Sequence, residues 1–64
     1  MEYYLELSPD PFGRIGVLYR QCESQGIREY YDETLWNKIE HPIPPGAKEI
    51  SKSMARKLQD AYLV

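Results

Sequence analysis

The chain has 64 residues, a formal net charge of −2 and a hydrophobic share of 42%. So short a chain makes one domain, residues 1–64, and buries only about 60% of the surface that its unfolded form exposes. Its single cysteine excludes an intrachain disulfide, and one cysteine with one histidine cannot supply the four ligands of a structural zinc site. We therefore expect a domain held together by packing, with assembly into a homodimer as the alternative source of stability.

The N-terminal stretch MEYYLELSPD has no basic segment and no long apolar run, so it is not typical of a signal peptide. No part of the chain approaches the roughly 20 consecutive apolar residues of a membrane helix. We expect a soluble protein of the cytoplasm, without membrane contact.

Residues 1–8 alternate between two sets of side chains, which is the period-two pattern of a half-buried strand. The first set is mainly apolar and comprises Tyr3, Leu5 and Leu7. The second set is mainly polar and comprises Glu2, Tyr4, Glu6 and Ser8. Two prolines, an Asp and a Gly in residues 8–13 predict a turn, and residues 14–22 predict a second strand with a bulge at Gly16. Together these segments predict an antiparallel hairpin.

Residues 27–39 allow two interpretations. Apolar side chains recur every four positions, as on one face of a helix, at Ile27, Tyr31, Leu35 and Ile39. The aromatic and β-branched content favours strands instead. We favour a third strand at residues 27–31 followed by a turn at residues 32–34, and the helix remains open.

Residues 41–63 carry the clearest local pattern. Pro44-Pro45-Gly46 predicts a turn, residues 47–50 a short strand, Ser51 an N-cap, and residues 52–63 an amphipathic helix. The three-and-four spacing predicts that the helix buries Met54, Leu58 and residues 61–62. The expected fold is α+β: a small antiparallel sheet, made of the N-terminal hairpin plus one or two short strands, packed against a C-terminal helix.

The run IPPGAKEIS, followed by a helix with Met54 and Leu58, resembles the C-terminal segment of phage tail-fibre-assembly-type proteins. The resemblance covers about a third of the chain, residues 41–63. The chain departs from that family at Lys48, where the family has an apolar residue, and at Lys52-Ser53, where acids usually follow the cap. The resemblance implies a phage origin, and so the cytoplasm of the host cell, and it implies no catalytic residues.

No group of residues suits catalysis. The only imidazole, His41, lies beside Glu40 and before Pro42 in an expected surface connection, and Cys22 is expected to be a small apolar filler near a strand end. The acids Glu29, Asp32, Glu33 and Glu40 do not have the spacing of a calcium-binding loop. We predict that the protein is not an enzyme and uses neither a cofactor nor a metal.

The segment REYYDETLW, residues 28–36, combines three acids with three large aromatic residues. Tyr4 similarly lies between two acids on the polar side of the first strand. Rings interleaved with carboxylates suit docking onto a basic surface, although the same rings are also suited to the core. The predicted partner-binding residues are Tyr4, Glu29, Tyr30, Asp32, Glu33 and Trp36.

We predict a non-enzymatic, phage-type interaction protein that inhibits or modulates a larger host protein. A nucleic-acid-binding host protein suits this acidic surface, as for an anti-defence or anti-CRISPR inhibitor. One alternative is a small nucleic-acid-binding regulator, because residues 41–64 carry four bases against two acids. Its contacts would be Lys48, Lys52, Arg56 and Lys57. The other alternative, implied by the resemblance, is a phage assembly accessory protein.

Overall fold

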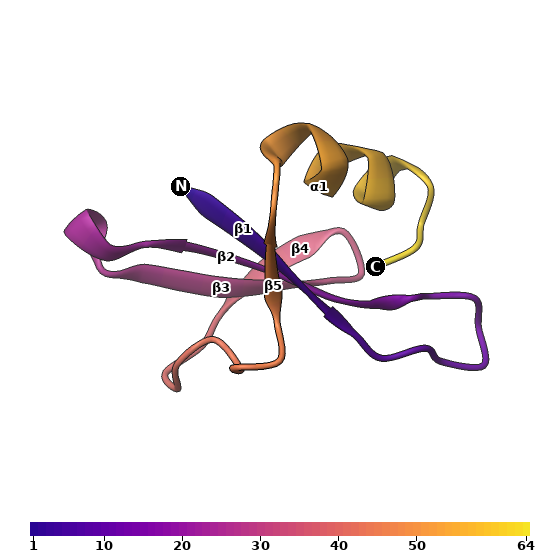
Figure 1. The fold of residues 1–64 in the computed structure, drawn as a ribbon, viewed down its shortest axis with the longest axis horizontal. Helices are drawn as coiled ribbons and strands as arrows, with labels where there is room; N and C mark the ends of the chain where they lie inside the picture. The colour runs from indigo at the N-terminus through magenta and orange to yellow at the C-terminus, as the bar shows by residue number, and fades with distance from the viewer.

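A computed structural model describes all 64 residues, and its five strands form one antiparallel sheet in the spatial order β4-β3-β2-β1-β5 (Figure 1). The strands are β1 (Glu2–Leu7), β2 (Gly16–Cys22), β3 (Ile27–Asp32), β4 (Leu35–Lys38) and β5 (Lys48–Ile50). A single 3₁₀ turn, η1 (Glu23–Gln25), joins β2 to β3, and the helix α1 (Lys52–Asp60) follows β5. The α+β prediction is confirmed.

The β1–β2 hairpin forms as predicted, with Leu5 opposite Leu18 and Leu7 opposite Gly16. Its loop is longer than predicted and is closed by the Asp10 carboxylate, which accepts from the backbone N–H groups of Phe12 and Arg14. The predicted bulge at Gly16 is wrong, because Gly16 pairs one-to-one with Leu7 in the same register as the rest of the hairpin. Glycine is required there for another reason: a Cβ atom would lie 2.1 Å from the backbone oxygen of Glu6.

Residues 27–38 form a second hairpin, so the helical interpretation of this region is wrong. Asp32 still pairs with Leu35, which leaves a turn of two residues, Glu33 and Thr34. Both have positive φ angles, 49° and 71°, as a type I′ turn requires. Asn and Gly suit such a turn far better than Glu and the β-branched Thr, so this turn is strained.

The helix begins as predicted: the Ser51 hydroxyl accepts from the Met54 N–H at 3.0 Å. It ends three residues earlier than predicted, because the Leu63 N–H donates to the Leu58 carbonyl and the Tyr62 N–H to the Gln59 carbonyl. This pair of bonds is a Schellman motif, and it places Tyr62 at φ 57°, where glycine is usual.

The buried face of α1 differs from the predicted one by about one position. Ala55 and Leu58 are buried, whereas Met54 is 45% exposed and Tyr62 is 78% exposed. The prediction failed at Tyr62 because the Schellman motif ends the helical periodicity before this residue.

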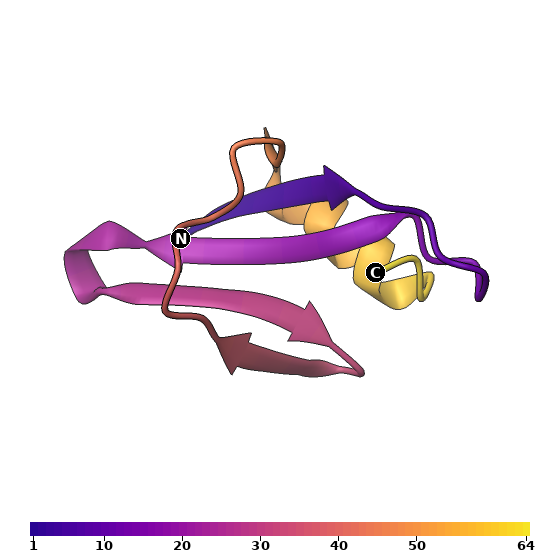
Figure 2. The same cartoon turned by 90° about the horizontal axis from the view of Figure 1, so that it is seen from below.

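Two layers cover opposite faces of the sheet. Helix α1 lies behind β1 and β2 in Figure 2, while the connection of residues 39–47 crosses in front. This crossing is unavoidable, since β4 and β5 lie at opposite edges of the sheet. This proline-rich connection contains the predicted turn, in which the Ala47 N–H donates to the Pro44 carbonyl. His41 is exposed in the same connection. No helix in the structure is long and apolar enough to span a membrane.

The core lies between the sheet and α1. It consists of Leu18, Ala55, Leu58 and Val64. Leu18 is the only large side chain that is completely buried. Half-buried rings of Tyr3, Tyr31 and Trp36 extend this core toward β3 and β4, which α1 does not cover (Figure 2).

Candidate interaction surfaces

The pleat of the sheet divides the predicted partner-binding residues between two faces. Tyr4 and Tyr30 lie on the face opposite α1, because both are in register with Tyr19. Glu29 and Trp36 point to the α1 side, since side chains alternate along a strand. The predicted residues therefore do not form one continuous patch.

The face opposite α1 carries a row of tyrosines bordered by acids. Tyr4, Tyr19 and Tyr30 are cross-strand neighbours on β1, β2 and β3, and Glu49 on β5 is opposite Tyr4. We call this surface the tyrosine–carboxylate face. Its members are Tyr4, Tyr19, Tyr30, Glu2, Glu6 and Glu49. Sequence reasoning missed Glu49, because only the pairing of β5 with β1 brings it beside Tyr4.

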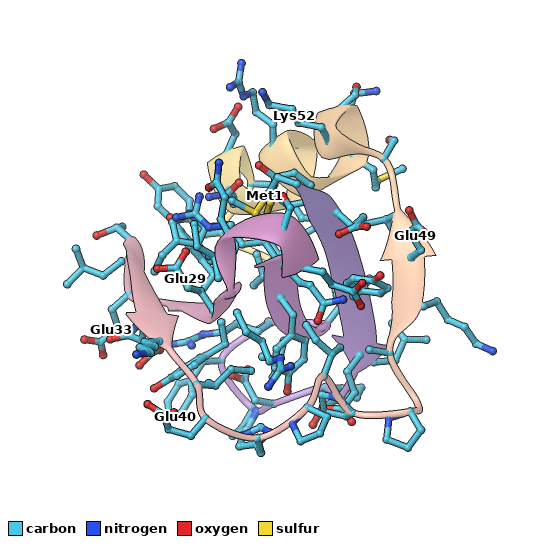
Figure 3. All side chains as sticks on the ribbon, turned by 90° about the vertical axis from the view of Figure 1, so that its left-hand side faces the viewer. Met1, Glu29, Glu33, Glu40, Glu49 and Lys52 are labelled. Atoms are coloured by element: carbon cyan, nitrogen blue, oxygen red, sulfur yellow. The ribbon has the colours of Figure 1, made fainter.

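None of the three acids of this face forms an ion pair. Partial burial raises the pKa of the Tyr4 phenol above 10.0, and the charges of Glu2, Glu49 and Glu23 raise it further. Burial likewise raises the pKa of Tyr19, helped by Glu6, which accepts from its hydroxyl at 3.3 Å. Several carboxylates without an ion pair therefore surround two neighbouring phenols, which stay neutral. Figure 3 shows Glu49 on the edge strand β5, far from Glu29 and Glu33.

Two of the other predicted acids are neutralised within the molecule. The Glu29 carboxylate accepts from Arg20 Nε at 2.7 Å, and Asp32 lies 3.4 Å from the Arg14 guanidinium. Glu33 is exposed in the strained turn and has no ion pair. Glu29 and Asp32 therefore offer less free charge to a partner than the sequence suggested.

On the α1 side, the uncovered part of the sheet carries an aromatic cluster around Trp36. Its ring makes edge-on contacts with Tyr31 and Tyr3, at centroid distances of 5.2 Å and 6.2 Å. The Arg20 guanidinium stacks on the same ring, 4.1 Å from its centroid. Arg20 is thus held by both Trp36 and Glu29.

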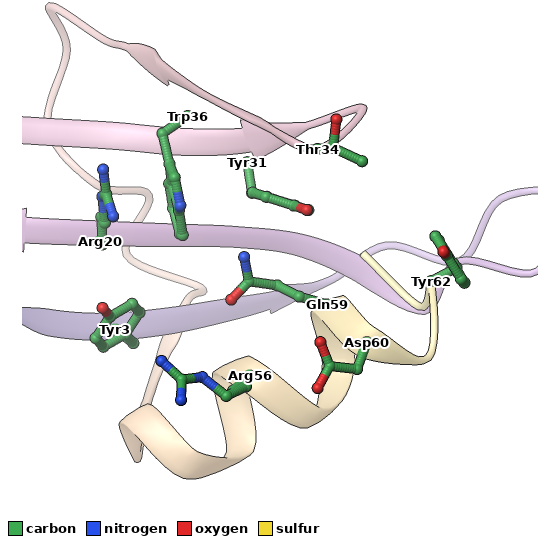
Figure 4. A pocket seen from close by; sticks show the side chains of 9 residues that line it. All are labelled: Tyr3, Arg20, Tyr31, Thr34, Trp36, Arg56, Gln59, Asp60 and Tyr62. Carbon is green, nitrogen blue, oxygen red and sulfur yellow. The ribbon is translucent and has the colours of Figure 1, made fainter.

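A groove separates this cluster from α1 (Figure 4). We call it the aromatic groove; its volume is about 450 Å³. Its lining residues are Tyr3, Arg20, Tyr31, Thr34, Trp36, Arg56, Gln59, Asp60 and Tyr62. The groove joins Trp36, predicted to bind a protein, with Arg56, predicted to bind nucleic acid, although the two are 20 positions apart in the sequence.

The predicted nucleic-acid-binding residues are all exposed and none forms an ion pair. Lys52, Arg56 and Lys57 lie along α1 and border a second, shallow hollow beside Ser53 and Asp60. Arg56 and Asp60 are shared by this hollow and the aromatic groove. Lys48 is on β5, and strands β1 and β2 separate it from Tyr31 in the groove's far wall on β3.

All three non-glycine residues with positive φ, Glu33, Thr34 and Tyr62, lie at one end of the groove. Such conformations cost roughly 1–3 kcal/mol each and cluster at functional sites in proteins. The strain comes from two separate elements, the β3–β4 turn and the end of α1, which meet at this point. No sequence pattern predicted it.

The remaining candidates for chemistry stand alone. A hydrogen bond with the Ser24 hydroxyl lowers the pKa of Cys22, the last residue of β2, but the chain has no second thiol to accompany it. No group of three or more His, Cys, Asp or Glu side chains is placed to hold a metal ion. Comparison of the chain with protein-family models, curated proteins and solved structures gives no match, so these surfaces are interpreted from their geometry.

Proposed function

We propose that the protein is a non-enzymatic interaction module that binds a larger host protein and blocks or modulates it. The tyrosine–carboxylate face is its contact surface, and the partner presents a basic patch such as a nucleic-acid-binding cleft. Inhibition of a host defence effector, as by an anti-CRISPR protein, is the concrete form of this function, and a phage origin is part of the proposal.

The observation that supports this proposal is the concentration of unpaired carboxylates around Tyr4 and Tyr19. Uncompensated acids attract a basic partner and accelerate encounter, and the half-buried rings of Tyr4 and Tyr30 supply the short-range contact area that holds a complex. Tyr19 lies between them in the sheet but is only 7% exposed, so it contributes little contact area. The carboxylates of Glu29 and Asp32 are less available to a basic partner, because each forms an ion pair with an arginine of the same chain. The acids around Tyr4 have no such ion pair.

The test is a pull-down from bacterial lysate with the retained protein identified by mass spectrometry. The double variant Glu2→Lys/Glu49→Lys reverses two exposed charges beside Tyr4, and Glu33→Lys reverses one exposed acid in the distant turn as the matched control. We expect the double variant to bind the identified protein about tenfold more weakly or worse, and the control to bind it as the native chain does. Equal retention of all three, with unchanged circular dichroism, would exclude this face as the contact.

A further inference from the structure

The proposed contact surface leaves the opposite side of the molecule without a role. There, three exposed cations of α1 adjoin the aromatic groove through Arg56. The groove has rings along its length, from Tyr3 through Trp36 and Tyr31 to Tyr62 (Figure 4). Beyond Tyr62, a smaller hollow continues to Phe12, which is 86% exposed.

We propose that the aromatic groove binds a single strand of nucleic acid. Its bases stack on the rings of the groove, and its phosphates contact Lys52, Arg56 and Lys57 on α1. Every base has a π face, so a row of rings beside a line of cations is a platform for single strands of many sequences. A duplex keeps its bases stacked on one another and offers this platform only its phosphates.

The net charge of −2 does not oppose this contact, because the fold separates the charges. Glu2, Glu6 and Glu49 lie on the other face of the sheet, and Glu29 is neutralised by Arg20. Asp60 is the one acid that lines the groove, and the unpaired Glu33 lies just beyond its end. The three unpaired cations of α1 outnumber these two acids; they are Lys52, Arg56 and Lys57. The local balance on the α1 side is therefore positive, and it complements a polyanion.

Tyr62 provides independent support. It holds a large, 78% exposed ring in a left-handed backbone conformation that favours glycine, so the folded state alone gives no reason for this residue. A tyrosine kept at such a position is explained if its ring contacts a ligand. Removing the ring should then weaken binding while relieving strain.

Trp36 is the only tryptophan and lines the groove, so its fluorescence reports directly on occupancy. We expect oligothymidylate to quench it, with a slope of log K against log salt of about −2, as three phosphate contacts on a single strand predict. Arg56→Ala, an exposed change, should reduce the magnitude of this slope by about 0.7. A blunt-ended duplex of the same length should bind at least tenfold more weakly.

The decisive variant is Tyr62→Gly, which should raise thermal stability yet weaken oligothymidylate binding by about 5- to 150-fold, the range for one stacked base. Met54→Ala, on an exposed part of α1 outside the groove, is the matched control and should leave binding within twofold. The proposal is overturned if oligothymidylate causes no quenching, if the duplex binds equally well, or if Tyr62→Gly binds like the native chain. It is also overturned if a poly-glutamate peptide binds more tightly than the oligonucleotide, because the groove then serves an acidic protein segment.

The nucleic-acid proposal and the proposed function are tested by different variants, so one can be contradicted without the other. Arg56→Ala and Tyr62→Gly lie on the α1 side and should not change the pull-down, whereas Glu2→Lys/Glu49→Lys acts on the opposite face. All of these substitutions are at exposed positions, so each variant should keep the native circular dichroism spectrum, lose one activity and retain the other.

Discussion

The two halves of the sheet surface on the α1 side differ in what covers them. Over β1 and β2, the helix buries Leu18, Ala55 and Leu58 in an aliphatic core. Over β3 and β4, nothing covers the sheet, and Trp36 and Tyr31 remain half-exposed beside the strained residues. The covered half therefore contributes most of the buried apolar core. The uncovered half has large, partly exposed rings and lies beside residues with unfavourable backbone angles, which lower the stability of the fold.

A chain of 64 residues is expected to be stable by only about 3–10 kcal/mol, so single changes distinguish the two halves well. Changes in the covered half should act on folding, and changes in the uncovered half should act on binding with smaller effects on folding.

The largest effect is expected for Leu18→Ala. Leu18 is 0% exposed, and its truncation leaves a cavity that costs about 2–5 kcal/mol, enough to unfold much of the protein. Leu35→Ala is the matched control on β4, where the side chain is 65% exposed, and should cost no more than about 0.5 kcal/mol. Urea unfolding followed by circular dichroism measures both; similar losses would mean that the buried Leu18 contributes no more to stability than an exposed leucine.

Trp36→Ala should cost about 2 kcal/mol, less than Leu18→Ala. It removes two edge-on aromatic contacts, each worth ~0.5–1.5 kcal/mol, and the stacked Arg20, worth ~0.5–1 kcal/mol. Trp36→Phe keeps a ring in place and should recover about half of the loss. A cost above that of Leu18→Ala, in the same urea experiment, would show that the aromatic cluster is the main core.

Thr34→Gly should stabilise the protein by about 1 kcal/mol, because Thr34 has a positive φ that glycine adopts without steric cost. The melting temperature measures the gain. Gly26→Thr, at another exposed turn with positive φ, is the reverse change and should destabilise by a similar amount. A loss of stability in Thr34→Gly would mean that contacts of the threonine side chain outweigh its backbone strain.

The smallest expected effect is on the pH dependence of stability. The pKa of Tyr19 is higher in the folded state than its ordinary 10.0, so the folded chain holds this proton more tightly than the unfolded chain. The resulting stabilisation is complete below pH 10 and is lost as pH rises through the folded-state pKa. Urea midpoints between pH 9 and 11.5 should fall less for Tyr19→Phe than for the native chain, and parallel curves would contradict a raised pKa.

The sequence predicted the elements whose signals are local. Alternation identified β1, the Ser51 hydroxyl identified the start of α1, and aromatic content favoured strands over a helix at residues 27–39. It did not predict the end of α1, because the apolar periodicity continues to Leu63 whereas the helix does not. The Schellman hydrogen bond from the Leu63 N–H ends the helix and places Tyr62 in an unfavourable, left-handed conformation.

The candidate surfaces were predicted only in part, because strand register decides which side chains become neighbours. Composition singled out the tyrosines and the basic helix residues. It could not show that Glu29 pairs with Arg20, or that Glu49 lies opposite Tyr4. Each of these contacts joins residues from different strands.

By itself, the sequence determined the α+β class and excluded a disulfide within the chain, because the cysteine count is a matter of composition and because alternation and capping act over a few residues. Only the tertiary structure decided the strand order, and with it the placement of Glu2, Glu6 and Glu49 on the face opposite the cations of α1. The sheet order places β5 beside β1 and turns Trp36 toward Arg56, since backbone pairing across the chain, rather than local pattern, fixes which face each side chain occupies.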